Sequence, residues 1–474
     1  MDRGHPGGED QGRLTVAALL ARAREAQAEF ERWPQARVDD AVLACGWAIL
    51  EPGRNRTLAE IAVRDTGMGD VADKIAKNHR KTLGLLRDLA GVRTVGVIAE
   101  YPEKGITEVA RPVGVVAALT PSTNPAATPA NMIINALKCR NAIVLAPSPK
   151  GHSTCAALLE FVHAELARVG VPPALVQMLP APVTREATQE LMRRCDLVVA
   201  TGSQANVRAA YSSGTPALGV GAGNVVSIVD ASADLADAAA KIARSKTFDH
   251  ATSCSSENAV VILAPVYDAM LGALQRAGGV MLDAAEKARL QATMFAGGRL
   301  APAVIAQPAP RIAALAGLER ETARRARFLM VEESGAGPEY PFSGEKLSPV
   351  LAVYRARDFD DACRIAQEIY AYQGKGHSVS LHTREEAQAM RLALELPVAR
   401  VIVNQAHCFA TGGSFDNGLP FSLSMGCGTW GRNSFSDNLH WRHFLNITRI
   451  ARTIPERVPS EEEIFGTWFA KYGR

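Results

Sequence analysis

The sequence lacks several features that would mark a membrane, secreted or nucleic-acid-binding protein. It contains no run of about 18 apolar residues, which excludes a conventional membrane-spanning helix. The first residues, MDRGHPGGEDQ, have no apolar stretch of the kind found in secretory signals. The net charge is only +3 and no basic block is interleaved with aromatic residues, so nucleic-acid binding has little support. We expect a cytoplasmic protein without nucleic-acid or membrane partners.

Cysteine is also sparse, and none of the eight cysteines forms a CxxC pair. Scattered cysteines suit a reducing compartment and argue against a disulfide framework or structural zinc, so we expect no metal site. Four of them are expected to be small core residues: Cys139, Cys155, Cys195 and Cys363. Cys254, which lies in a polar loop, is the exception.

The length of 474 residues and the hydrophobic content of 47% predict a globular chain with two or three packed units. Residues 1–12 are expected to form a disordered tail. Residues 14–33 are predicted to form an amphipathic helix, and more helix follows to about residue 90. The expected apolar face of the first helix consists of Leu14, Ala17, Ala18 and Ala21.

From residue 113 the pattern alternates between apolar strands and helices. Five strands are expected, in the segments VGVVAAL, NAIVLAP, LVQMLPA, DLVVAT and NVVSIVD. This alternation predicts a parallel sheet covered on both faces, a doubly wound domain that binds ligands at the carboxyl ends of its strands.

A second α/β unit is expected from about residue 245, with strands in NAVVILAP, VLAVYRA and RVIVNQ. The segment AQPAPRIAALAG is expected to be a surface connection. Residues 94–112 have the two-residue period of strands and predict a hairpin with a turn at residues 102–105.

The loop FDHATSCSSENAVVI surrounds Cys254 with small polar residues, which would let an electrophile approach its sulfur. A nucleophilic cysteine must be partly accessible and readily deprotonated, and polar surroundings favour both. From the local sequence alone, a serine-rich turn with an incidental cysteine is an equally good interpretation.

The same loop resembles the catalytic segment of CoA-acylating aldehyde dehydrogenases. Further blocks match that family in order: ARPVGVVAALTPSTNPAATP, NAIVLAPSPKG, VVATGSQANVRAAYSSGTPALGVGAGN, EKLSPVLAVY, GKGHSVSLHT and GGSFDNGLPFSLSMGCGTWGRNSFSDNL. They run from about residue 94 to the end of the chain. The likeness is greatest to the CoA-dependent enzymes for sulfoacetaldehyde and succinate semialdehyde.

The resemblance implies an α/β fold of the aldehyde dehydrogenase type, with two doubly wound domains and a small β oligomerisation element. The nicotinamide-cofactor domain would comprise residues 13–93 and 113–244, and the catalytic domain residues 245–438. Residues 94–112 and 439–474 would form the oligomerisation elements, so a homodimer or homotetramer is expected.

The resemblance also implies roles for the residues at the reacting centre. Cys254 would be the nucleophile that forms a thioester, and the Asn124 amide, with the Cys254 backbone N–H, would stabilise the oxyanion. Glu345 would bind the ribose next to the nicotinamide. Alternatives remain, since Thr-Asn-Pro is common in turns and an isolated Glu-Lys is usually a solvated pair.

The cofactor would be NADP or NAD, and CoA would be the co-substrate. The backbone at Gly202 and Ser203, where a helix opens after a strand, would approach the pyrophosphate. Lys150 and Ser148 favour the 2′-phosphate of NADP, although Lys150 on a solvated helix start would point away. The full set of expected cofactor residues is Thr120, Pro121, Ser148, Lys150, Gly202, Ser203, Gly219, Gly221 and Glu345.

Two positions depart from the hydrolytic branch of the family. Gly219 stands where that branch has a glutamate that activates water, so a thioester would survive until CoA attacks it. Ala146 stands where hydrolytic members hold the adenosine ribose with a lysine, which suggests a looser adenosine end through which CoA would enter.

The substrate is expected to be a short aldehyde with an anionic far end, sulfoacetaldehyde first and succinate semialdehyde second. The expected contacts are Thr252, Ser253, His407 and Arg432. Alternatively, these polar residues only hydrate the tunnel mouth, and the substrate is acetaldehyde or propanal. A hydrolytic enzyme, a catalytically idle homologue and a cysteine hydrolase using His250 are the other interpretations.

Overall fold

The computed structural model describes residues 6–474, with side chains from residue 12 onward. The first helix, α1, spans Pro6–Phe30. The predicted tail at residues 1–12 is therefore helical from Pro6, while residues 1–5 lie outside the described part of the chain. Three further helices follow, as predicted: α2 (Gln35–Leu50), α3 (Pro52–Thr66) and α4 (Val71–Leu89).

Helix α1 packs with a different face from the one predicted. Val16, Leu19, Leu20 and Ala23 are buried, whereas Leu14 is 67% exposed. The buried residues follow the helical spacing i, i+3, i+4, i+7 and remove three large side chains from water. The predicted face offered one leucine and three alanines, a weaker hydrophobic stripe.

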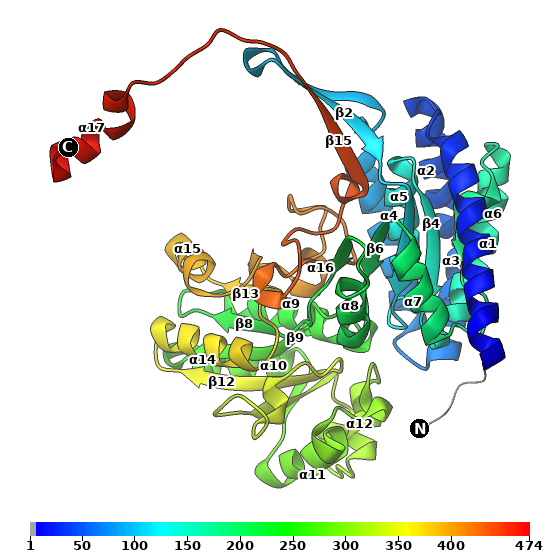
Figure 1. The fold of residues 1–474 in the computed structure, drawn as a ribbon. Coiled ribbons are helices and arrows are strands. Elements are labelled where there is room, and N and C mark those ends of the chain that lie inside the picture. The colour runs from blue at the N-terminus through cyan, green and yellow to red at the C-terminus, as the bar shows by residue number, and fades with distance from the viewer. Residues whose placement is uncertain (1–5) are drawn as a thin grey trace.

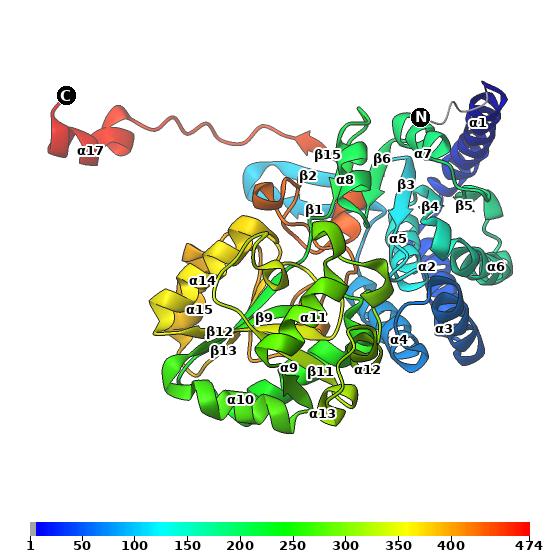
Figure 2. The same cartoon turned by 90° about the horizontal axis from the view of Figure 1, so that it is seen from below.

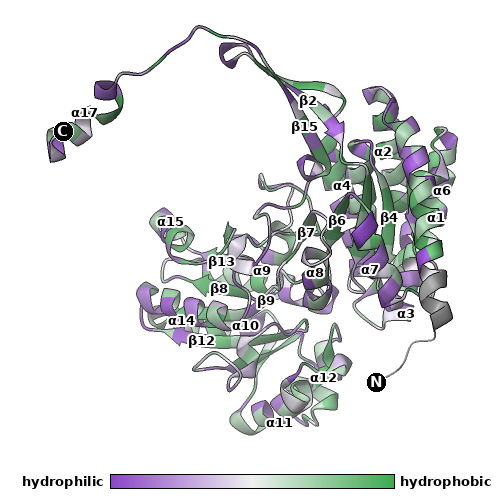
Figure 3. Ribbon diagram, viewed as in Figure 1, coloured by the Kyte–Doolittle hydropathy of each residue, from purple (hydrophilic) through white to green (hydrophobic). Residues whose placement is uncertain are grey.

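The first parallel sheet has five strands in the order β5-β4-β3-β6-β7. Its strands are β3 (Val115–Thr120), β4 (Ala142–Pro147), β5 (Val176–Met178), β6 (Leu197–Ala200) and β7 (Ala217–Gly219). The helices between them are α5 (Ala127–Lys138), α6 (His152–Arg168), α7 (Arg185–Arg194) and α8 (Gln204–Tyr211). Strands β4 and β6 are hydrophobic along their length, while α7 is largely hydrophilic (Figure 3).

The second parallel sheet has seven strands in the order β10-β11-β12-β9-β8-β13-β14. They are β8 (Val225–Val229), β9 (Glu257–Leu263), β10 (Gly279–Met281), β11 (Phe328–Glu332), β12 (Val350–Ala356), β13 (Val379–His382) and β14 (Val401–Val403). Its helices are α9 (Leu235–Thr247), α10 (Tyr267–Arg276), α11 (Ala284–Met294), α12 (Ala309–Leu315), α13 (Glu321–Arg324), α14 (Phe359–Tyr372), α15 (Glu386–Glu395) and α16 (His407–Ala410). Two doubly wound units are therefore present, as predicted.

Two predictions about this second unit are corrected. The prediction that NVVSIVD belongs to the first sheet is wrong, because this strand, β8, pairs with β9 and β13. The first sheet therefore ends at Gly219 and the second begins at Val225, before the predicted boundary at residue 244. The segment predicted as a surface connection contains α12, whose Ile312 and Ala313 are fully buried. A short apolar strand does not show which of two sheets it will join, and Pro308 before α12 concealed its helical start.

The third sheet is antiparallel, with the order β1-β2-β15. The predicted hairpin forms β1 (Gly96–Tyr101) and β2 (Ile106–Pro112), and β15 (Leu445–Ala451) returns from the end of the chain to pair with β2. Beyond β15 an extended segment carries the last helix, α17 (Glu461–Tyr472), away from both domains (Figures 1 and 2). None of the described helices combines the length and apolar character that crossing a bilayer requires.

The register of the first sheet determines where its loops begin. Thr120 pairs with Pro147 across β3 and β4, and Leu119 pairs with Ala200 across β3 and β6. The loops after these three strands therefore leave the same edge of the sheet, on the side that faces the second domain (Figure 1).

Candidate active site

A cavity of about 490 Å³ lies where the loops of the two parallel sheets meet. It brings together residues from the end of β3, from the loop after β6, from the glycine segment before β8, and from the loop before β9. The predicted site residues that line it are Thr120, Pro121, Asn124, Ser148, Gly202, Ser203, Gly221, Thr252, Ser253, Cys254 and Glu345.

Four predicted site residues do not line this cavity. Lys150 and Arg432 are exposed, and Arg432 has a left-handed backbone with φ of 57°. His407 is fully buried behind the Cys254 loop, where its Nδ1 lies 2.8 Å from the Ser255 carbonyl oxygen. Gly219 is also buried. Direct substrate contact by His407 and Arg432 is therefore not supported.

Cys254 is the cysteine whose surroundings suit a nucleophile. It is partly exposed and lines the cavity, whereas Cys427 is fully buried, as are the four predicted core cysteines at 7% exposure or less. All eight cysteines are free. Desolvation, with Glu345 and Cys427 nearby, raises the pKa of Cys254 to about 12, so the resting residue is a thiol.

The chain before Cys254 is held in a strained turn. Asp249, His250 and Ala251 all have left-handed backbones, with φ of 50°, 50° and 59°. Each such residue costs about 1–2 kcal/mol, so the turn persists only because its surroundings fix it. The Asp249 N–H donates to Asp73 Oδ2 at 2.7 Å, and Asp249 Oδ1 accepts from the Asp70 N–H at 2.8 Å. Both partners lie at the start of α4.

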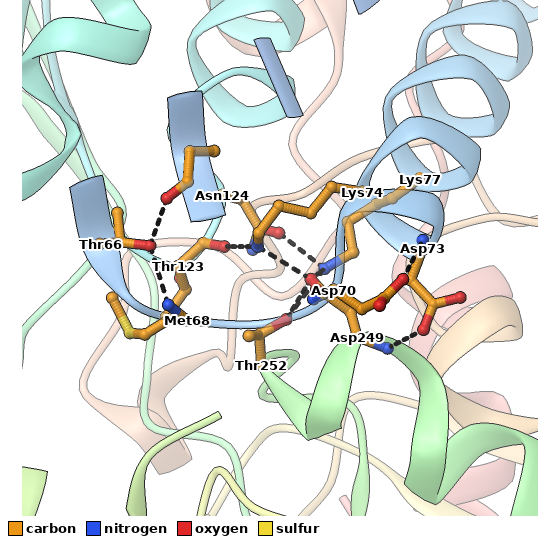
Figure 4. Close-up of polar contacts among 11 residues, drawn as sticks. Thr66, Met68, Asp70, Asp73, Lys74, Lys77, Thr123, Asn124, Asp249 and Thr252 are labelled. Atoms are coloured by element: carbon orange, nitrogen blue, oxygen red, sulfur yellow. Dashed lines mark hydrogen bonds and ion pairs between the residues drawn. The ribbon is translucent and has the colours of Figure 1, made fainter. Parts of the chain in front are cut away.

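Lys77, on α4, connects this turn to Asn124 (Figure 4). Its Nζ lies 2.5 Å from Asp249 Oδ2, 3.0 Å from Thr252 Oγ1 and 2.8 Å from Asn124 Oδ1. An ammonium only donates, so the amide oxygen of Asn124 must face Lys77 and the NH₂ group points the other way. Because Asn124 lines the cavity, this orientation suits the donation to an oxyanion that the sequence predicts.

Asp249 is paired with two buried lysines. Lys74 Nζ lies 3.1 Å from the same carboxylate oxygen, and both lysines and the aspartate are almost completely buried. Burial alone raises the pKa of Asp249, but Lys77 and Lys74 outweigh it and bring the pKa to about 2. The carboxylate therefore stays ionised and fixes Lys77 at Asn124.

Gly219 is packed tightly against α8. A side chain there would bring its Cβ to 2.6 Å from Val207 Cγ1 and 2.8 Å from Tyr211 Cε2. The Tyr211 hydroxyl also bonds both the N–H and the carbonyl of Gly219, at 2.9 and 3.1 Å. A carboxylate base at this position has no room in this arrangement.

The polar residues of the cavity wall fit a nicotinamide dinucleotide. Ser148 Oγ and Thr128 Oγ1 are buried at this wall and have no hydrogen-bond partner among the described residues. Ser203 caps α8, whose positive end lies at the cavity and suits a phosphate. Glu345 lies on the wall near Cys254, and burial raises its pKa to about 8.

Sequence reasoning missed the contribution of α4. Lys74, Lys77 and Lys81 recur at intervals of three and four residues, so they share one face of the helix. All three are buried, and Lys81 lines the cavity. Three lysines at helical spacing on the face that packs inward were the sequence feature that could have indicated this contribution.

Comparisons with known proteins agree with this geometry. Residues 9–287 match the Aldehyde dehydrogenase family. The chain is 68% identical to sulfoacetaldehyde dehydrogenase (acylating) from Cupriavidus necator over 97% of this chain and 93% of that protein. It is 38% identical to succinate-semialdehyde dehydrogenase (acetylating) from Clostridium kluyveri, over 96% of this chain and 99% of that protein. The crystal structure of an acetylating aldehyde dehydrogenase from Geobacillus thermoglucosidasius superposes with a TM-score of 0.91 at 35% identity. The superposition covers 95% of this chain and 99% of that chain.

The chain therefore belongs to the aldehyde dehydrogenase family. The three relatives named above match along nearly its whole length and are described as acylating or acetylating enzymes, which confirms the branch predicted from the sequence blocks.

Proposed function

We propose that this chain oxidises sulfoacetaldehyde to sulfoacetyl-CoA, using a nicotinamide cofactor and a thioester on Cys254. The observation that carries the proposal is the position of Cys254 and Asn124 on one cavity, with Asn124 oriented by Lys77. The 68% identity to an acylating sulfoacetaldehyde dehydrogenase supports the substrate. The first sheet with its helices is the cofactor domain in this proposal, and the second sheet supplies Cys254.

The steps follow from the residues that line the cavity. The Cys254 thiol loses its proton to water in the cavity, and the resulting thiolate sulfur bonds to the aldehyde carbon. The oxyanion that forms accepts hydrogen bonds from the Asn124 NH₂ and the Cys254 backbone N–H. A nicotinamide held against Gly202, Ser203 and Glu345 would supply the acceptor for the hydride that leaves this carbon. The CoA sulfur then attacks the thioester carbon and Cys254 leaves. The reverse path reduces an acyl-CoA by the same chemistry.

Water competes poorly with CoA in this proposal because Gly219 supplies no base. Val207 and Tyr211 also pack so tightly against Gly219 that no neighbouring side chain can occupy the position of the missing base. Acyl-CoA is therefore the expected product, with little free acid.

A second candidate substrate is succinate semialdehyde, because the acetylating enzyme for it is 38% identical along nearly the whole chain. The two substrates share an aldehyde and an anionic far end but differ in length.

NADP is the proposed cofactor. Ser148 Oγ is buried and unpartnered where β4 ends, and Lys150 follows two residues later. A hydroxyl and a cation at this place would bind the adenosine 2′-phosphate, and no carboxylate lies among the residues that line the adjoining cavity wall apart from Glu345.

The test is a substrate panel: sulfoacetaldehyde, succinate semialdehyde, acetaldehyde and propanal, each with and without CoA and with NAD or NADP. The highest kcat/KM is expected for sulfoacetaldehyde with NADP, with acyl-CoA as product. Rapid oxidation without CoA would refute the acylating chemistry. A clear preference for an uncharged aldehyde would refute the substrate while leaving the thioester step intact.

We also propose that the chain forms a homodimer or homotetramer in the cytoplasm. Apolar residues remain exposed along β15, the following segment and α17: Ile450, Ile454, Val458, Ile464, Phe465, Trp468 and Tyr472. A second copy of the chain would bury them and pair the free edge of β15. A monomer by light scattering at assay concentration would contradict this.

A further inference from the structure

A second, smaller cavity of about 30 Å³ adjoins the first beside Cys254. The two share five lining residues, and the small one is further bounded by α4 and two aromatic rings. The lining consists of Lys77, Arg80, Lys81, Asn124, Phe248, Ser253, Cys408, Phe409 and Leu423. It contains three cationic side chains and no carboxylate.

Lys81 is a buried cation without a counter-charge. Its side chain lines both cavities, and its Nζ makes one hydrogen bond, to the Gly412 carbonyl oxygen at 2.6 Å. No carboxylate of the described residues lies within ion-pair distance of it. Two of its three N–H bonds are therefore free to donate. Gly412 leaves the space for this ammonium, since a Cβ there would lie 2.7 Å from Nζ.

Arg80 stands beside Lys81 and reaches its nearest carboxylate, Asp416, only through the Ser414 hydroxyl. Its Nη1 donates to the Phe409 carbonyl at 2.9 Å and its Nη2 to Ser414 Oγ at 2.7 Å, both neutral acceptors. Lys77 differs, because its three donors are already taken by Asp249, Thr252 and Asn124. A buried unpaired cation costs several kcal/mol, which a bound anion would offset.

We infer that this small cavity is a subsite for the anionic far end of the aldehyde, a sulfonate or carboxylate held by Lys81 with Arg80. The inference rests on the proposed thioester chemistry at Cys254 and names the part of the site that selects the substrate. The volume is at least twice the 10–15 Å³ or so that a single water needs, which suits a small anionic group on a short chain.

The position of the subsite restricts the length of the substrate. Ser253 and Asn124 line both cavities, so the carbonyl at Cys254 and the anion at Lys81 are separated only by the junction between them. Phe248, Phe409 and Leu423 supply apolar walls that exclude water and strengthen the interaction between the charges. Arg432, the cation predicted from the sequence, lies outside both cavities.

The test compares two aldehydes of similar shape. Sulfoacetaldehyde carries a sulfonate where 3,3-dimethylbutanal carries an uncharged tert-butyl group. Lys81→Met should lower kcat/KM for sulfoacetaldehyde by about 100-fold, mainly through KM, and change kcat/KM for 3,3-dimethylbutanal by less than about threefold. Lys81→Arg, which keeps the charge, should retain most of the preference. Lys241→Met, at a half-buried position of α9 outside both cavities, is the matched control and should match wild type.

Four outcomes would overturn the inference. If Lys81→Met lowers both substrates equally, Lys81 has a structural or thiol-activating role instead. If it lowers neither, the anion binds elsewhere, although the proposed acylating function stands. If wild type forms no sulfoacetyl-CoA at all, the proposed function fails with it. Ethanesulfonate should inhibit wild type competitively against sulfoacetaldehyde, and the absence of such inhibition would also contradict the subsite even if no Lys81 variant folds. Adding 3-oxopropanoate to the panel distinguishes a carboxylate subsite from a sulfonate one.

Discussion

The two regions contacted by the buried face of α4 differ in how their charges are matched. Lys77 belongs to a closed network with Lys74 and Asp249. Each N–H of the Lys77 ammonium has a partner within 3.0 Å. Around Lys81, one helical turn further on, the lining has cations but no carboxylate. The helix is the same and so is the residue type, so the difference lies in what the opposing loop supplies.

This contrast teaches how to separate structural charges from those that await a ligand. A paired buried charge fixes geometry, here the strained turn and the Asn124 amide. An unpaired one, next to an open cavity, is costly unless a ligand of opposite charge completes it. Mutations in the two regions should therefore affect different properties.

The largest effect is expected at Lys77. Lys77→Met removes the group that orients Asn124, so kcat should fall by about 100- to 1000-fold for charged and uncharged aldehydes alike. It also leaves Asp249 with one cationic partner, at a cost of about 3–5 kcal/mol in unfolding free energy. Steady-state kinetics on both aldehydes, measured well below the melting temperature, checks the predicted loss of kcat. Unchanged kcat in a folded variant would contradict the positioning role.

The next effect is on stability at low pH. Because the folded pKa of Asp249 is lowered to about 2, below its unfolded value of about 3.9, its contribution is present above pH 4 and is lost as pH falls toward 2. The contribution is about 2–3 kcal/mol. Denaturant unfolding of wild type and Asp249→Asn at several pH values should show a gap that narrows through this window. A constant gap would contradict the assignment.

The Lys81 region should instead show a pH-dependent substrate preference. Desolvation, with Arg80 nearby, lowers the pKa of Lys81 to about 7, so the free enzyme loses the ammonium as pH rises through that value. The charged or titratable groups that face it are Arg80 and Lys77 on α4, Cys408 on α16 and Cys254.

The ratio of kcat/KM for sulfoacetaldehyde over 3,3-dimethylbutanal should fall by up to about tenfold per pH unit above pH 7. Using the ratio removes the ionisation of Cys254, which affects both substrates. A ratio that stays flat to about pH 9 would show that the preference does not depend on Lys81.

The smallest effect is expected at Lys150. This side chain is exposed, and exposed charge pairs contribute about 1 kcal/mol or less, so Lys150→Ala should lower kcat/KM for NADP by about fivefold at most. The value for NAD should not change. If both cofactors respond equally, or neither does, Lys150 points away from the 2′-phosphate.

The sequence predicted the centre of the site better than its surroundings. Cys254, Asn124 and Glu345 lie in short continuous blocks, and the structure places them on one cavity. Lys77 and Lys81 were not predicted as site residues, because their functions depend on contacts with residues 47 to 331 positions away in the chain. Those residues are Asn124, Asp249 and Gly412. The sequence of a helix does not show whether one of its lysines is buried, because that depends on the residues that pack against it.

The misplaced residues have local causes that sequence patterns do not reveal. His407 was expected at the cavity, but its ring bonds the Ser255 carbonyl and Thr411, so it supports the loop from behind. Arg432 sits in a left-handed turn and is exposed. In both cases the backbone direction of a loop decides where the side chain lies, and polar loop residues fit several directions equally well.

The most direct test of the account is to trap the acyl-enzyme. Wild type incubated with sulfoacetaldehyde and NADP but no CoA should gain the mass of one acyl group, and peptide mapping should place it on Cys254. Adding CoA should remove the mass and release sulfoacetyl-CoA, while Cys254→Ala should gain no mass at all. An acyl group on Cys427, or release of free acid at the same rate with and without CoA, would contradict the account.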